Sequence, residues 1–322
     1  MGISGIELCR RFYAEIVGPQ LSVPHSAALL GRGSEVLGYD DEMSTDHNCE
    51  ARVVLFVDDP AAVTVELPEK FLDRSTHLEK HTVTGFFVEQ LGFDPAAGIA
   101  VEDWLAVPEQ HLGILTAGEV FHDDLGLQAV RDRLAYYPDD VWRYLLIAAW
   151  WRVHPELNHV GRTGYVGDEL GSGLVAATLV ENLMRVCFLI ERRYPPYVKW
   201  FGTAFARLDC GPELVPLLQA VLRTGNWQDR DQALQLAYRA IGELYNRSGI
   251  TEPVELGLED MFGRPFKTVW GDFPRALADT ISDPRVKAIA QRWPAGGIER
   301  IRDVVWKPAD RLAATAFIRT AS

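Results

Sequence analysis

The chain has 322 residues, a formal net charge of −13 and 48% hydrophobic residues. We expect a chain of this length to form one large domain or, more readily, two. Its apolar content is enough to bury a core and excludes a disordered chain. A general nucleic-acid-binding protein carries basic surface, so the acidic balance argues against nucleic acid as a partner.

The four cysteines, Cys9, Cys49, Cys187 and Cys210, have no paired spacing. This argues against a zinc knuckle or a disulfide framework and favours reduced thiols in an intracellular protein. The chain lacks an uninterrupted apolar run of about 18 residues, the length that spans a bilayer. Its first helix reads as amphipathic, without the apolar core of a signal peptide. We therefore expect a cytoplasmic protein with no membrane partner.

The first part of the chain predicts a mixed α/β unit. Apolar side chains at helical spacing predict a helix over 4–17, and short apolar runs predict buried strands at 27–30 and 52–57. Further elements are expected in the order helix 61–74, strand 78–84, helices 84–91 and 101–116, and a last short strand over 118–123.

From residue 127 the pattern becomes helical. Clear helices are predicted over 127–134, 139–154, 169–192, 212–223 and 228–248, and the mixed tail predicts helices near 273–282, 284–292 and 308–320. Pro195-Pro196 ends one helical segment, because a second proline removes a donor and disfavours helical backbone before it. We predict an α/β domain over 1–125 and an all-α helical bundle over 126–322.

A small-residue turn with a metal-binding pattern after it carries the predicted chemistry. Gly33 and Ser34 follow the first strand, where backbone N–H groups and one hydroxyl can meet phosphate oxygens. About a dozen residues later come Asp46 and Asn48, which point to one face of an extended segment. Oxygen ligands there can hold a divalent cation against the phosphates.

Asn48 weakens this pattern, because it keeps an amide oxygen but lacks one charge. Two carboxylates would bridge a pair of metal ions, so the change should reduce affinity for a second ion. Four nearby acids offer compensation: Asp40, Asp41, Glu42 and Glu50.

The order Gly33-Ser34-x-x-x-Gly38, then Asp46-x-Asn48 and an apolar strand, resembles the signature of the nucleotidyltransferase superfamily. That superfamily includes the aminoglycoside and lincosamide nucleotidyltransferases. The stretches 161–172 and 191–205 look like a largely uncharacterised bacterial family of nucleotidyltransferase-like proteins, whose members usually read Asp-His-Asp at 46–48. The resemblance extends from residue 5 to about residue 310.

The resemblance implies a small α/β catalytic domain followed by a helical domain that helps to bind substrate. It implies Mg²⁺, in one or two ions, and transfer of a nucleoside monophosphate from a nucleoside triphosphate (NTP) to a hydroxyl or amine of a small molecule. It does not indicate which acceptor is used. Asp46 and Asn48 are the predicted metal ligands, Asp46 is also assigned to catalysis, and Gly33 and Ser34 are the predicted NTP contacts.

Such a reaction also needs a third carboxylate and a base. Glu66, Glu79 and Asp123 are the candidates for the carboxylate, and we favour Glu79 because it lies on the predicted strand 78–84. His81 is an alternative base, since the ordinary pKa of histidine is near neutral.

Two basic residues of the helical half are predicted to contact the triphosphate. Lys199 stands between aromatic residues after the double proline, and Arg185 lies on the helix 169–192. A surface ion pair is the competing explanation for Arg185.

Other features have structural and functional interpretations. Asp168-Glu169 follows a glycine-dense stretch, and aspartate is a good helix N-cap, so both roles stay open. Trp150-Trp151 favours packing over a stacking platform. Asn48 also fits a degenerate protein that binds nucleotide without transferring it, and a helical interaction protein with a merely structural amino-terminal unit is a third reading.

Overall fold

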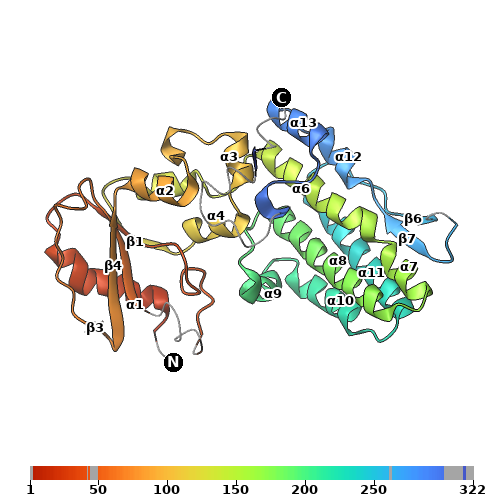
Figure 1. The fold of residues 1–322 in the computed structure, drawn as a ribbon, viewed down its shortest axis with the longest axis horizontal. Coiled ribbons are helices and arrows are strands. Elements are labelled where there is room, and N and C mark those ends of the chain that lie inside the picture. Colours follow the sequence, from red (N-terminus) through yellow and green to blue (C-terminus); the bar gives the residue numbers. More distant parts are fainter. Residues whose placement is uncertain (1–2, 42, 44–49, 261–262, 301–314, 317–322) are drawn as a thin grey trace. The chain divides into compact units, whose positions relative to one another are not determined.

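The computed structural model describes residues 3–41, 43, 50–260, 263–300 and 315–316 (Figure 1). The chain divides into two compact units, one running to Tyr136 and the other beginning at Tyr137 among these residues. The helix after the predicted boundary near residue 125 therefore belongs to the first unit. Cys9, Cys187 and Cys210 are free and buried.

The first unit contains a five-stranded mixed sheet with the strand order β3-β4-β2-β1-β5. Strands β2 and β4 are parallel and the other neighbours antiparallel. The strands are β1 (Ser26–Leu29), β2 (Ala51–Phe56), β3 (Lys70–Phe71), β4 (Arg74–His81) and β5 (Glu119–Asp123). The α/β prediction is confirmed, as are the strands expected near 27, 52, 78 and 118.

One face of this sheet is covered by the first helix. Leu8 and Phe12 pack against Val53 and Leu55 of β2 in a buried cluster. The helical segments of the unit are α1 (Gly5–Phe12), the π-helical η1 (Tyr13–Val17), η2 (Gly18–Gln20), α2 (Val83–Leu91), η4 (Pro95–Ala97), α3 (Val101–Ala106), α4 (Glu109–Thr116) and α5 (Leu127–Asp132). The predicted helix 101–116 is interrupted before α4 by Pro108, which stands at the helix N-cap.

The prediction of a helix over 61–74 is wrong. After a turn this segment is extended and leads into the hairpin of β3 and β4. Val63 and Val65 alternate toward the core, and the Gln20 side chain pairs with the backbone N–H and carbonyl of Glu66. Extended backbone lets the two valines share one face, which helical spacing does not.

Helix α5 is fixed to the first unit by one buried arginine. The Arg131 guanidinium donates to the carbonyls of Leu115, Thr116 and Ala117 at 3.2, 2.8 and 2.7 Å. These carbonyls lie at the end of α4, where a helix leaves its last acceptors without partners of its own. Arg131 therefore acts as the carboxyl-terminal cap of α4.

The second unit is helical, with one two-stranded ribbon that the sequence did not predict. Its elements are α6 (Asp139–Val153), η5 (His154–Glu156), α7 (His159–Tyr165), α8 (Glu169–Ile190), α9 (Val198–Ala206), α10 (Gly211–Arg223), α11 (Trp227–Ser248), β6 (Gly257–Asp260), β7 (Lys267–Trp270), α12 (Phe273–Ala278), α13 (Pro284–Arg292) and η6 (Ile298–Arg300). The helix expected over 308–320 lies outside the described residues, apart from Thr315 and Ala316.

The centre of this unit is aromatic. Trp150 is fully buried and stacks on Phe273 with ring centroids 4.1 Å apart, while Tyr238 and Tyr245 meet it edge-on. The packing prediction is confirmed for Trp150. Its neighbour Trp151 is 46% exposed.

Helix α8 is long and apolar enough to cross a membrane by length and composition, with a mean hydropathy of 1.7. Half of that stretch is buried, and the helix packs against α6, α7, α10 and α11. A helix that packs against neighbours on several sides is apolar because those sides avoid water, as the surface of a membrane-spanning helix does.

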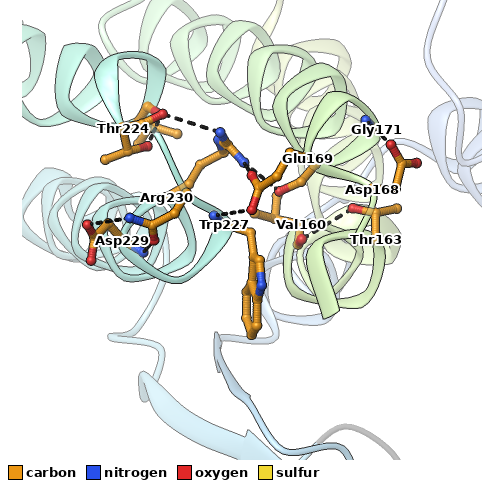
Figure 2. A network of polar contacts seen from close by, with 12 residues as sticks. Val160, Thr163, Asp168, Glu169, Gly171, Thr224, Trp227, Asp229 and Arg230 are labelled. Atoms are coloured by element: carbon orange, nitrogen blue, oxygen red, sulfur yellow. Dashed lines mark hydrogen bonds and ion pairs between the residues drawn. The ribbon is translucent and has the colours of Figure 1, made fainter. Parts of the chain in front are cut away.

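A polar network joins the starts of α8 and α11 (Figure 2). Buried Arg230 donates to Glu169 Oε2 at 3.0 Å and to Ser172 Oγ at 2.8 Å, and the Trp227 amide donates to Glu169 Oε1. Asp168 caps α8 by accepting from the Gly171 amide at 2.7 Å. Both acidic residues therefore have structural roles.

Candidate functional site

Residues 31–38 form a turn directly after β1. Gly33 has a φ of +134°, a backbone conformation that residues with a side chain rarely adopt. A Cβ at this position would overlap the Glu35 carboxylate. The Tyr39 amide donates to the Ser34 carbonyl at 2.9 Å, and the Gly118 amide donates to the Val36 carbonyl at 2.9 Å. The backbone is thus folded tightly at the position where the sequence predicts phosphate binding.

Arg52, on β2, ties this turn to the sheet. Its guanidinium donates to the carbonyls of Leu30 and Arg32 at 3.0 and 2.8 Å and to Glu35 Oε1 at 2.8 Å. Burial raises the pKa of Glu35, and Arg52 opposes that rise. The ion pair therefore favours the charged form of this buried carboxyl, while its arginine fixes the turn.

Glu79 lies on the same face of the sheet as Arg52. In the parallel pairing of β2 with β4, Arg52 is opposite His77 and Val54 is opposite Glu79. Side chains alternate along a strand, so positions 77 and 79 share a face. The turn and the favoured third carboxylate are thus attached to one face of two neighbouring strands.

The surroundings of Glu79 suit a cation ligand. Its side chain is 40% exposed, and its carboxylate lies between two imidazoles, 3.4 Å from His77 Nε2 and 3.5 Å from His81 Nε2. A half-exposed carboxylate can be reached by a hydrated ion, and oxygen is the donor that Mg²⁺ prefers. His81, the alternative base, also lies 3.8 Å from Glu89.

The two other carboxylate candidates are placed differently. Asp123 accepts from the Ser26 hydroxyl at 2.6 Å and from the amides of Leu127 and Gln128, which hold its pKa below the usual range against the effect of burial. Glu66 is exposed on the extended segment before β3. Asp123 is therefore committed to capping α5.

The predicted metal ligands Asp46 and Asn48 lie outside the described residues. The strand that follows them, β2, begins at Ala51. Among the acids that offered compensation, Asp40 accepts from the Gly5 amide at 2.8 Å and so caps the start of α1. Glu42 lies outside the described residues.

The two predicted triphosphate contacts lie in the second unit. Arg185, on α8, is 3.3 Å from Glu181 and lies over the Phe201 ring of α9, with its Cζ 5.1 Å from the ring centroid. Lys199 is exposed at the start of α9, and its Nζ lies 4.8 Å from the Trp200 ring centroid. The ion pair weighed against a ligand role for Arg185 is present.

A hollow of about 780 Å³ opens beside Arg185 on the second unit. Its lining combines an indole, aliphatic side chains, an amide and charges of both signs. The lining residues are Trp151, Arg152, Pro155, Glu156, Leu174, Val175, Thr178, Glu181, Asn182, Arg185 and Glu299. Trp151, which is 46% exposed, is the one aromatic side chain among these lining residues.

Sequence reasoning missed the pair of Arg52 and Glu35. A signal was present, because Arg52 is the single charge at the start of the apolar run 52–57, and Glu35 directly follows the Gly-Ser pair. A charge at the end of a buried strand needs a partner.

Comparisons with known proteins give similarities of two kinds. Residues 104–201 match the model of a family described as a domain of unknown function (DUF4037). A solved structure, that of a nucleotidyltransferase-like protein from Exiguobacterium sibiricum, is 10% identical, with a TM-score of 0.33 over 82% of this chain and 97% of that chain. No curated protein matches the chain significantly.

Proposed function

We propose that the chain is a Mg²⁺-dependent nucleotidyltransferase that moves a nucleoside monophosphate from an NTP to a hydroxyl or amine of a small molecule. One observation carries the proposal: Arg52 ties the Gly33-Ser34 turn to the sheet face that bears Glu79. The segment with Asp46 and Asn48 leads into the strand between these two features.

Each residue then has a separate role. Gly33 and Ser34 bind phosphate oxygens, and Asp46, Asn48 and Glu79 supply oxygen ligands. When bound, Mg²⁺ neutralises charge that develops on the transferred phosphoryl group. Arg52 positions the turn and does not touch the substrate. Lys199 and Arg185 of the second unit are proposed to contact the triphosphate.

Transfer of label from an α-labelled NTP tests this function. The full chain is incubated with Mg²⁺ and a panel of hydroxyl- and amine-bearing metabolites and antibiotics. Glu79→Gln should reduce transfer by about 100-fold or more, the scale of a lost acid–base or ligand group. Glu89→Gln is the matched control on α2. Absence of both transfer and NTP affinity in the unmodified chain would refute the proposal.

Asn48 supports a second candidate, a protein that binds nucleotide without transferring it. In this case NTP binds and stabilises the chain, but no label moves. Asn48→Asp restores the missing charge and should strengthen Mg²⁺ binding. If neither Mg²⁺ nor NTP affinity changes, residue 48 is not a metal ligand.

Titration with NTPs separates both candidates from the third, an interaction protein without nucleotide. A site-bearing protein gains about 2.7 kcal/mol of stability at a ligand concentration of 100 times Kd. An unchanged melting temperature across the four NTPs with Mg²⁺ would favour the interaction protein.

A further inference from the structure

Two histidines and an aspartate meet at the opposite end of β1 from the Gly33-Ser34 turn. His25 directly precedes β1, while His122 and Asp124 lie at the end of β5. Antiparallel pairing aligns Ser26 with Asp123 and Ala27 with His122, which brings these segments together. One ligand atom from each of the three side chains lies within 4.8 Å of the other two.

The hydrogen bonds of His25 fix its tautomer. Nδ1 lies 2.8 Å from the Val23 carbonyl, which can only accept, so Nδ1 carries the proton. Nε2 therefore presents a lone pair, and it lies 2.9 Å from the Tyr13 hydroxyl. An imidazole whose other nitrogen donates to a backbone carbonyl is the usual arrangement of a metal-binding histidine.

His122 stacks on His25 with ring centroids 4.3 Å apart and an interplanar angle of 26°. Its Nε2 is buried and lies 2.8 Å from Asp124 Oδ2. The same Asp124 oxygen accepts from the backbone N–H of His25 at 3.3 Å. Asp124 therefore contacts both histidines, and this brings the three ligand-bearing side chains to one place.

We propose that His25, His122 and Asp124 bind a late first-row divalent ion such as Zn²⁺. Two imidazole nitrogens and one carboxylate oxygen are a common ligand set for this ion, with the fourth position left to water or a further oxygen. Binding the ion would release the Tyr13 hydroxyl from His25 Nε2, the atom that it contacts at 2.9 Å. Mg²⁺ is a poor occupant, because it prefers oxygen ligands in an octahedral arrangement.

The ion would fasten the start of β1 to the end of β5. None of its ligands belongs to the nucleotide site, so this inference does not depend on the proposed function. The site also differs from the cluster of Glu79 with His77 and His81 on β4.

Cobalt binding tests the site in the full chain after treatment with a chelator. Co²⁺ should bind with visible absorption bands typical of nitrogen and oxygen ligands, and one equivalent of Zn²⁺ should remove them. His122→Gln and Asp124→Asn should each raise the Co²⁺ Kd by about 10-fold or more. Losing a residue that only supports a ligand already costs about that much, and losing a ligand should cost at least as much. Excess Mg²⁺ should leave the bands unchanged.

Matched variants at the other histidine cluster, His77→Gln and His81→Gln, should keep the wild-type Kd. Circular dichroism and melting without metal confirm that each variant folds, and Zn²⁺ should raise the melting temperature of the wild type but not of His122→Gln. The proposal is overturned if folded His122→Gln and Asp124→Asn bind Co²⁺ as tightly as the wild type, or if binding is lost only in the β4 variants.

Discussion

The Arg52 guanidinium and the Glu35 carboxylate lie 2.8 Å apart, with only 12% and 8% of their side chains exposed. Taking two charges out of water is costly, and the cost is recovered only while both partners are present. Since Arg52 also donates to two carbonyls of the chain leading into the turn, the pair couples the shape of the turn to the integrity of β2.

Arg52→Met should therefore destabilise the first unit by about 3–5 kcal/mol, the cost of leaving a buried charge unpaired. Hydrogen exchange at the amides of β2 measures this, because it reports on the first unit separately. Without Arg52 the pKa of Glu35 rises further, so the carboxyl takes up a proton more readily. The penalty should shrink as the pH falls, because a neutral acid is cheaper to bury.

The double variant with Glu35→Gln added is the control for that pair. It removes the stranded charge, so it should recover part of the stability lost in Arg52→Met. A double variant as unstable as the sum of the two single ones would show that the pair is not coupled.

Gly33→Ala tests how tightly the turn is built. The new Cβ would overlap the Glu35 carboxylate at a φ of +134°, which adds a clash to a backbone strain of about 1–3 kcal/mol. Gly38→Ala is the control, since its φ is +68° and its Cβ would have nothing within 4 Å. We expect the first substitution to lower the melting temperature more than the second, and to weaken NTP binding if the turn holds phosphate. Equal effects would contradict the crowding described at Gly33.

Two glycines of the second unit, one in α7 and one in α8, can be compared by substitution. A Cβ on Gly164 in α7 would lie 2.1 Å from Trp227 Cγ, whereas one on Gly173 in α8 would have nothing within 4 Å. Gly164→Ala should cost about 1–3 kcal/mol through overpacking. Gly173→Ala should instead stabilise by up to about 1 kcal/mol, since alanine favours helix. Urea unfolding followed by tryptophan fluorescence compares the two.

Asp231 gives the second unit a pH dependence with a definite sign. Burial raises the pKa of this carboxyl, which accepts from Gln235 at 2.7 Å, to about 6. From about pH 4 to 6 the unfolded chain releases the proton first, so Asp231 lowers stability as the pH rises through this range. Asp231→Asn should match the wild type near pH 4 and exceed it by up to about 3 kcal/mol at neutral pH. A constant difference across that range would show that the carboxyl titrates normally.

Periodicity located the long helices and the apolar strands because each buries a continuous stripe or face. The helix expected over 61–74 failed because its valines are two residues apart and its partner, Gln20, is distant in sequence. Helix α7 was not predicted, because its residues overlap the glycine-dense stretch before Asp168. Gly164 lets the Trp227 side chain pack directly against the backbone of this helix. A single sequence does not reveal such a contact between distant residues.

For the candidate site, the sequence indicated the turn and Glu79, and the structure places both on one sheet face through Arg52. The sequence did not indicate the Arg52–Glu35 pair or the contact of His25 with His122. Pairing between strands that are distant in sequence creates these contacts. Asp123 looked like a ligand by residue type alone. Its hydroxyl and amide donors come from β1 and α5, so only the folded chain shows that it caps a helix.

The cap that Arg131 forms on α4 bears on how the chain can be divided. A truncated protein that stops near residue 125 would leave the carbonyls of Leu115, Thr116 and Ala117 without this donor. Limited proteolysis aimed at isolating the sheet-bearing half should therefore yield a stable fragment only when the cut falls beyond Arg131.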